Sequence, residues 1–259
     1  MCRWAAYIGS PIYLEEIVTA PGQSLIDQSL HAEESKTPTN GDGFGIAWYG
    51  DRETPGLYHD VLPAWADDNL RNLAHQVQSR LFLAHVRAAT GTATSRTNCH
   101  PFTVGRWSFM HNGQAGGYRQ FRRDVDMSIS ESCYNHRYGT TDSEALFLMA
   151  MSDGLSDDPK AALERATGRM EAMSRETGVT PHMRMTVAIS DGEKLYCARY
   201  ASDQFAPTLY HRSMDGGRVV VSEPLEHDNG EWHAIPPGSF ATITADGVGI
   251  QPFQPSLHA

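Results

Sequence analysis

A cysteine directly follows the initiator methionine, and its position is the strongest chemical signal in the sequence. Once Met1 is removed, Cys2 carries a thiol and a free α-amine on the same residue. The amine has a pKa near ~8 and a free thiol one near ~8.5, so the amine can take the thiol proton near neutral pH. The alternative is a chance cysteine at a frayed terminus, but cysteine accounts for only 4 of the 259 residues. The position therefore favours an N-terminal thiol nucleophile.

Two charged residues have the chemistry to bind the charges of an amino acid. Arg87 follows a predicted strand at 81–86, and strand alternation places it on the same face as His85. A guanidinium there can bind a carboxylate through two hydrogen bonds, although a structural ion pair is the simpler explanation. Asp142 falls in the first turn of a predicted helix, where the helix dipole favours an acid in any case. As a pair, the two residues would bind the carboxylate and the ammonium of a substrate.

The tripeptide His111-Asn112-Gly113 closes a predicted strand at 106–111. Asn-Gly is a strong turn signal, which is one explanation for it. The other is an oxyanion hole, in which the Asn112 amide and the Gly113 N–H stabilise a developing negative charge. Glycine suits that role because it lets the backbone come close to a ligand.

The cysteines and histidines do not form a standard metal-binding motif. The four cysteines are scattered and lack a C-x-x-C pair, so neither a disulfide framework nor a conventional zinc site is indicated. A zinc site built from Cys99, His100, His111 and Cys133 remains an alternative, but its spacing is not typical. We expect no metal and no organic cofactor.

Composition restricts the classes of partner and compartment. The chain has 40% hydrophobic and 20% charged residues, as in an ordinary globular protein, and a formal net charge of −10. This charge disfavours nucleic acid and anionic membrane surfaces as main partners. No apolar run approaches ~20 residues, and the N-terminus lacks the features of a secretory signal. We expect a cytoplasmic protein with one domain over residues 1–259.

The predicted elements indicate an α+β fold with antiparallel strands. Residues 3–8 read as a strand, residues 10–17 and 24–32 as helices, and 66–79 as the clearest early helix. Further helices are predicted at 118–125, 141–154 (with a Thr141–Glu144 capping box) and from Asp158 to about Gly178. After that, three Asp-Gly turns at 191–192, 215–216 and 246–247 separate short strands. Such turns are typical of hairpins, and so of antiparallel sheet rather than a parallel doubly wound fold.

Seven motifs in this order resemble the class II glutamine amidotransferases, which belong to the N-terminal nucleophile hydrolases. The motifs extend over nearly the whole chain: MCRW (1–4), NGDGFGIAWY (40–49), HVRAATGT (85–92), NCHPF (98–102), HNG (111–113), TTDSE (140–144) and VVVSEPLE (219–226). The likeness is greatest to the small stand-alone members of the class. It implies a four-layer αββα sandwich of two antiparallel sheets.

The resemblance also implies a role for each matching residue. Cys2 would be the nucleophile with its own α-amine as base, and Asn112 and Gly113 would form the oxyanion hole. Arg87 would bind the α-carboxylate of glutamine or a γ-glutamyl group, and Asp142 its α-ammonium. Thr90 would line the same pocket and His100 would lie at its edge.

The chain departs from the larger members of the class in two respects. Many of them have an aromatic residue after the arginine, where this chain has Ala88, and this alters the expected pocket lid. They also fuse the glutaminase to a synthase domain, which we do not expect here. Three alternatives follow: a γ-glutamyl amide hydrolase or peptidase of the glutathione- or ergothioneine-pathway kind that transfers no ammonia, a catalytic chain that needs a separate synthase or peptidase subunit, and a non-catalytic binding protein.

Overall fold

The fold consists of two antiparallel sheets, described in a computed structural model for residues 2–34, 38–89, 91–226 and 232–256. Within these residues, the first sheet has the strand order β11-β9-β10-β1-β4-β2-β3 and the second β13-β12-β8-β7-β6-β5. The first contains β1 (Arg3–Tyr13), β2 (Phe44–Trp48), β3 (Gly56–Asp60), β4 (Gln78–Val86), β9 (Tyr210–Met214), β10 (Gly217–Val221) and β11 (His233–Ala234). The second contains β5 (Phe102–Val104), β6 (Trp107–Ala115), β7 (Met183–Ser190), β8 (Leu195–Ala201), β12 (Ser239–Ile243) and β13 (Val248–Pro252).

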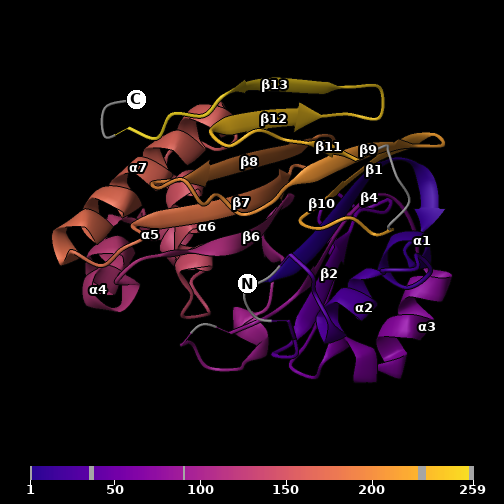
Figure 1. Cartoon of the computed structure of the whole chain (residues 1–259). Helices are drawn as coiled ribbons and strands as arrows, with labels where there is room; N and C mark the ends of the chain where they lie inside the picture. Colours follow the sequence, from indigo (N-terminus) through magenta and orange to yellow (C-terminus); the bar gives the residue numbers. More distant parts are fainter. Residues whose placement is uncertain (1, 35–37, 90, 227–231, 257–259) are drawn as a thin grey trace.

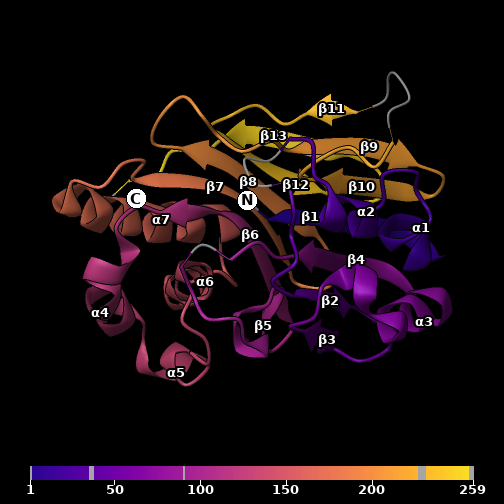
Figure 2. The same ribbon diagram turned by 60° about the horizontal axis from the view of Figure 1, so that its bottom comes forward.

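Helices cover the outer face of each sheet (Figure 1). The first sheet carries α1 (Glu15–Val18), α2 (Leu25–Leu30) and α3 (Asp68–Gln76), and the second carries α4 (Tyr118–Ser128), α5 (Glu131–Tyr134), α6 (Asp142–Ser152) and α7 (Pro159–Thr177). Short 3-10 turns occur at Ala64–Ala66 and Arg96–Asn98. The two helical groups lie on opposite sides of the paired sheets in both views (Figure 2).

Three apolar clusters separate these layers. The middle one packs Trp4 and Leu83 of the first sheet against Met110 and Ala188 of the second. Each outer cluster packs a sheet against its own helices, through residues such as Phe82 on one side and Phe109 on the other. Strand alternation explains the arrangement, because neighbouring residues of a strand face opposite layers. The predicted four-layer αββα sandwich is therefore confirmed.

The predicted helix at 10–17 is wrong. Strand β1 continues to Tyr13, and α1 contains only four residues after it. Beyond Ile8 the pairing with β4 shifts register and resumes at Ile12, which is opposite Ser79. The proline at position 11 suggested a helix start, but it lies in this irregular part of the strand, where its missing N–H is tolerated.

The strand predicted at 106–111 is β6 and continues to Ala115, so His111-Asn112-Gly113 does not close it and the turn explanation for Asn-Gly does not apply.

The other local predictions hold in most respects. The Asp-Gly turns connect β7 with β8, β9 with β10, and β12 with β13, each as an antiparallel pair. The Thr141 hydroxyl caps α6 by accepting from the Glu144 N–H at 3.1 Å. The reciprocal half of the predicted capping box is replaced, because the Glu144 carboxylate accepts from the N–H groups of Tyr138 and Gly139. Within the described part of the chain, no helix is long and apolar enough to cross a bilayer.

Candidate active site

Five of the predicted site residues line one cavity of about 440 Å³: Cys2, Arg87, His100, Gly113 and Asp142. They come from the position just before β1, the position just after β4, the loop before β5, strand β6 and the first turn of α6. Asn112 directly precedes Gly113 but does not line the cavity itself. Thr90 and Met1 lie outside the described residues, so their predicted contributions stay predictions.

The Cys2 side chain is half-buried at the edge of this cavity. Its Sγ lies 3.4 Å from the Ala88 nitrogen, which donates to it, and 3.6 Å from the Ala88 carbonyl oxygen. Burial raises the pKa of the Cys2 thiol, while the Ala88 N–H and the charge of Arg87 oppose that rise. Because burial prevails, the thiol needs a base to react at neutral pH.

Arg87 is a buried cation whose hydrogen bonds go to neutral groups. Its side chain is 3% exposed. Nη1 donates to the Asp42 carbonyl at 3.1 Å, and Nη2 donates to Thr92 Oγ1 at 2.7 Å and to the Ala93 carbonyl. No carboxylate within the described ranges forms an ion pair with it, so the structural ion pair considered above is not present there. A buried guanidinium without an anionic partner has the chemistry to bind a carboxylate.

The Asp142 carboxylate is held by backbone donors at the beginning of α6. Oδ2 accepts from the Ala115 N–H at 2.9 Å and Oδ1 from the Ser143 N–H at 2.9 Å. These bonds fix the carboxylate between β6 and the helix N-terminus while the side chain still lines the cavity. A charge positioned in this way suits an ammonium group.

The edge of β6 that faces Asp142 is unpaired at Gly113. N–H groups alternate between the two edges of a strand, and the Ala115 N–H points to Asp142 whereas the Gly116 N–H donates to the His182 carbonyl. The Gly113 N–H therefore points towards the edge of β6 at which Asp142 lies, away from β7. A Cβ at this position would clash with the Arg184 carbonyl and the His111 ring, which explains the glycine.

The Asn112 side-chain amide is buried without a hydrogen-bond partner in the part of the chain that the structure describes. The residue is fully buried, and neither its Nδ2 nor its Oδ1 has a hydrogen-bond partner within the described chain. An unpaired buried amide costs about 1–3 kcal/mol, which a ligand would recover. Side-chain alternation directs it between the sheets, where Met110 of the same strand also packs.

A pair of buried histidines lies behind the cavity. The rings of His85 and His100 are 4.2 Å apart between centroids, and His100 lines the cavity. Burial lowers the pKa of His85 to about 3 and that of His100 well below its ordinary value, so both are neutral. Neutral rings next to Arg87 add no second charge to compete for an anion.

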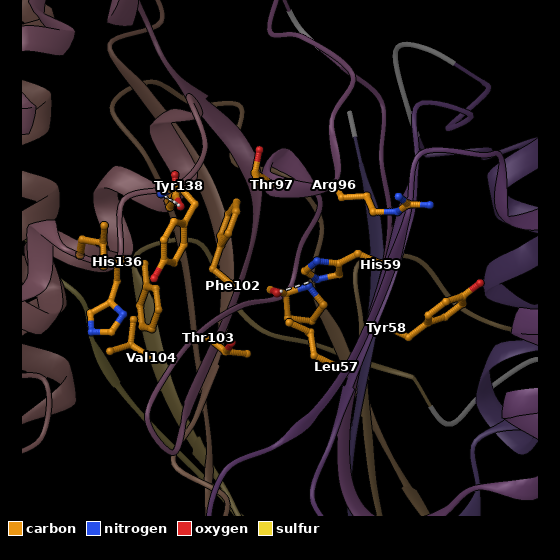
Figure 3. A pocket seen from close by; sticks show the side chains of 14 residues that line it. Leu57, Tyr58, His59, Arg96, Thr97, Phe102, Thr103, Val104, His136 and Tyr138 are labelled. Carbon is orange, nitrogen blue, oxygen red and sulfur yellow. Dashed lines mark hydrogen bonds between the residues drawn. The ribbon is translucent and has the colours of Figure 1, made fainter.

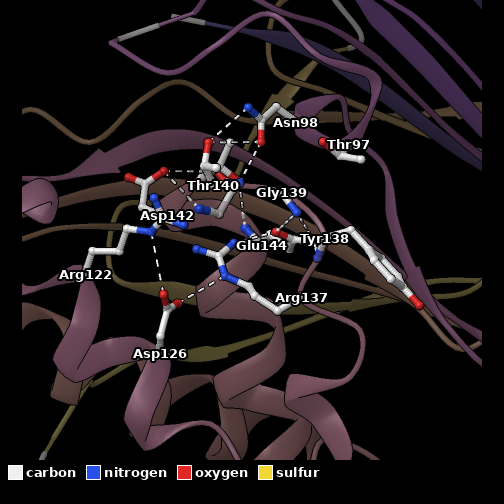
Figure 4. A network of polar contacts seen from close by, with 12 residues as sticks. Thr97, Asn98, Arg122, Asp126, Arg137, Tyr138, Gly139, Thr140, Asp142 and Glu144 are labelled. Carbon is white, nitrogen blue, oxygen red and sulfur yellow. Dashed lines mark hydrogen bonds and ion pairs between the residues drawn. The ribbon is translucent and has the colours of Figure 1, made fainter.

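Two residues with no role in the sequence-based prediction support the site. The Asp42 carboxylate accepts from the Ala89 N–H at 2.7 Å, next to the contact between Cys2 and Ala88. Asn98 donates to the Ala93 carbonyl at 2.8 Å and accepts from the Thr140 N–H at 2.7 Å (Figure 4). Asn98 thus connects the loop that holds Arg87 to the start of α6. Both residues occur in quoted motifs, NGDGFG and NCHPF, but the sequence gives no sign of these contacts.

A second cavity of about 460 Å³ is lined in part by residues 96–97 and 101–104 (Figure 3). Its walls are mainly apolar and aromatic, including Tyr58, Phe102 and Tyr138, and none of the predicted site residues lines it. In the described residues, no group of three or more His, Cys, Asp or Glu side chains is arranged to hold a metal ion. Of these two cavities, the one at Cys2 is therefore the one that contains predicted site residues.

Comparisons with known proteins agree with this arrangement. The family model described as glutamine amidotransferases class-II matches residues 19–212. The chain is 32% identical to the probable glutamine amidotransferase DUG3 of Saccharomyces cerevisiae, over 97% of this chain and 84% of that protein. It is 27% identical to a γ-glutamyl-hercynylcysteine sulfoxide hydrolase of Mycolicibacterium smegmatis, over 97% of this chain and 100% of that protein.

A solved structure is similar over the whole fold. It is that of a glutamine aminotransferase class-II domain protein from Silicibacter pomeroyi, with a TM-score of 0.79 and 45% identity. The match covers 98% of this chain and 100% of that one.

Proposed function

This chain belongs to the class II glutamine amidotransferases, and we propose that it hydrolyses the side-chain amide of glutamine or of a γ-glutamyl compound through Cys2. The observation that carries the proposal is the cavity that Cys2 shares with Arg87 and Asp142. An unpaired guanidinium and a carboxylate beside one thiol match the α-carboxylate, the α-ammonium and the amide of glutamine. We further propose that residues 1–259 act as one glutaminase-type domain without metal or organic cofactor.

The reaction would proceed through a thioester. The α-amine of Cys2, free once Met1 is removed, takes the thiol proton, and Sγ attacks the amide carbon. The Asn112 amide and the Gly113 N–H stabilise the oxyanion of the tetrahedral intermediate. The C–N bond then breaks, the α-ammonium returns its proton to the departing nitrogen, and ammonia or an amine leaves. Water, deprotonated by the same amine, attacks the thioester to release the γ-carboxylate and restore the thiol.

Labelling with the glutamine analogue 6-diazo-5-oxo-norleucine tests this proposal. The intact mass should lack Met1 and then gain one adduct that maps to Cys2, and excess glutamine should slow the labelling. Cys2→Ala should abolish both the adduct and the release of glutamate, whereas the control Cys133→Ala should retain them, because Cys133 lies on α5 outside the cavity. Full activity in Cys2→Ala would refute the mechanism. Processed protein that takes no label and releases no glutamate would favour a non-catalytic role or a missing subunit.

A second candidate is hydrolysis of larger γ-glutamyl amides without ammonia transfer. The cavity continues beyond Cys2, Arg87 and Asp142 to Gln114 and Arg119, leaving space for a substituent on the amide nitrogen. The similarity to a protein named as a γ-glutamyl-hercynylcysteine sulfoxide hydrolase supports the same candidate function. A higher kcat/KM for γ-glutamylglycine than for glutamine would select this candidate, and the reverse would exclude it.

A separate synthase or peptidase subunit is a further proposal about partners. Affinity capture of the intact protein from its native source, followed by an activity assay of the captured complex, addresses it. A gain in glutamate release over the isolated chain would support such a subunit.

A further inference from the structure

Under the proposed function, Cys2 becomes the first residue once Met1 is removed, and the ends of chains are usually poorly ordered. The register of β1 with its neighbours begins only at Arg3, which is opposite Val86. Cys2 therefore lies one residue beyond the paired part of the strand. Its thiol and its amine must nevertheless keep a fixed position relative to the substrate amide, so other contacts have to hold its main chain.

Arg3 supplies such a contact from the opposite face of the strand. Side-chain alternation points Cys2 towards the layer between the sheets and Arg3 towards the helical layer, where its side chain is completely buried. The Arg3 guanidinium folds back, and Nη1 donates to the Cys2 carbonyl at 3.1 Å. Nη2 donates to the Glu34 carbonyl. Arg3 does not line the cavity, so it acts on the nucleophile through the main chain alone.

Glu223 fixes the guanidinium. Its Oε2 lies 2.7 Å from Arg3 Nε, with side chains 0% and 2% exposed. The same carboxylate accepts from the N–H groups of Glu33 and Glu34 at 2.9 and 3.0 Å and from Gln23 Nε2 at 3.2 Å. The pair therefore joins the start of β1 to two distant segments of the chain, and the Nε contact is an ion pair rather than a well-aligned hydrogen bond.

A buried ion pair of this kind contributes little net stability, because desolvation offsets the attraction between the charges. The sheet also does not depend on it for register, because β1 pairs with β4 from Arg3 to Ile8 and with β10 from Ala5 to Gly9. Among the contacts of this ion pair, the bond to the Cys2 carbonyl is the one that reaches a residue of the cavity. The position of this bond indicates a role at the nucleophile rather than in the stability of the core.

We propose that Arg3 and Glu223 form a positioning pair that fixes the main chain of Cys2 and thereby aims its thiol and its α-amine at the substrate amide. The inference rests on the proposed function, since it takes Cys2 as the nucleophile. Neither residue touches the substrate. Their effect is therefore on the chemical step, while Arg87 and Asp142 continue to determine substrate binding.

Arg3→Lys is the decisive variant, and Glu223→Gln is the second. Lysine keeps a positive charge for Glu223 but lacks the fork that reaches Glu223, the Cys2 carbonyl and the Glu34 carbonyl together. Glutamine keeps the shape and an acceptor but removes the charge that anchors the guanidinium. Arg199→Lys is the matched control, because Arg199 also donates to main-chain carbonyls, those of Pro207 and Ile235, away from the cavity.

All variants are produced with a cleavable leader so that Cys2 is the first residue, and intact mass verifies this. In Arg3→Lys and Glu223→Gln we expect kcat to fall by about ten- to hundredfold, as when a reacting group is displaced by about 1 Å. KM for glutamine should stay within about twofold, since its binding residues are unchanged. The rate of labelling by diazo-oxo-norleucine should fall together with kcat. Arg199→Lys should keep the wild-type kcat even if its Tm falls by as much as the Tm of the other two variants.

Three results would overturn the inference: unchanged kcat in Arg3→Lys, an equal loss of kcat in Arg199→Lys, or a rise in KM without a fall in kcat. Where one variant fails to fold, the other decides by the same readouts. These failures are distinct from failure of the proposed function. If the function is wrong, the wild-type protein itself neither takes the label nor releases glutamate.

Discussion

Replacing Arg87 with lysine tests whether this residue binds the α-carboxylate of the substrate. The wild-type residue lines the cavity while its Nη groups donate to the Asp42, Thr92 and Ala93 acceptors. Lysine retains the charge but is a single point donor on a flexible stem, so it cannot hold these acceptors and a substrate carboxylate together. A hydrogen bond to a charged group contributes about 1.5–3 kcal/mol, so losing one weakens binding by about ten- to hundredfold.

We expect the KM for glutamine to rise by this factor and kcat to change much less, because the contact is made in both the ground state and the transition state. Steady-state release of glutamate, measured beside a thermal melt, separates the two constants from any loss of folded protein. Arg96→Lys is a matched control, since Arg96 is 67% exposed and pairs with Asp60 outside the cavity. A folded Arg87→Lys protein with KM within about twofold of wild type would refute the role of Arg87, as would an equal rise in Arg96→Lys.

Three further outcomes are expected. Asn112→Ala should lower kcat by about 10²–10³-fold without lowering Tm, because its amide has no partner to lose; a lower Tm with normal kcat would instead make it structural. Asn98→Ala should raise KM for glutamine, because the Arg87 loop and the start of α6 lose their connection, and unchanged kinetics would show that the connection is dispensable. Burial keeps His85 neutral with a pKa of about 3, whereas the unfolded chain takes up the proton below pH ~6.5, so stability should fall as the pH drops. Between pH 7 and pH 5 the free energy of unfolding should fall by about 2 kcal/mol on account of this histidine, and urea unfolding at both pH values measures the change. If His85→Gln loses as much stability as the wild type between these pH values, the explanation is contradicted.

Local chemistry explains why the hairpins and longer helices could be predicted from the sequence. An Asp-Gly turn fixes a hairpin within a few residues, and the Asp158-Pro159 start of α7 is visible in the chain itself. The segment at 10–17 could not be predicted from local chemistry. Its continuation as a strand depends on pairing with β4, some 65 residues further on, and a proline signal contains no information about that partner.

The site was predicted as a set of separate residues, and only topology brings them together. Arg87 and Asp142 each had a credible structural explanation in the sequence alone. The structure removes that explanation for Arg87, since the ion pair is not found in the described chain, but leaves the helix-dipole explanation for Asp142 in place. The partnership of Arg3 with Glu223 could not be predicted, because its members are 220 positions apart. Both fall in quoted motifs, MCRW and VVVSEPLE, but neither motif indicates that the two side chains meet.

The environment of Cys2 also explains why its base should belong to the same residue. Burial raises the pKa of the thiol, and the neighbouring histidines, His85 and His100, are held neutral by their own burial. A second side chain acting as base would enter the same apolar layer and would be subject to the same desolvation. The α-amine avoids this constraint, because its distance from the thiol is set by covalent geometry. What the fold must then provide is a fixed main chain at residue 2, and the buried guanidinium of Arg3 is the group that contacts it.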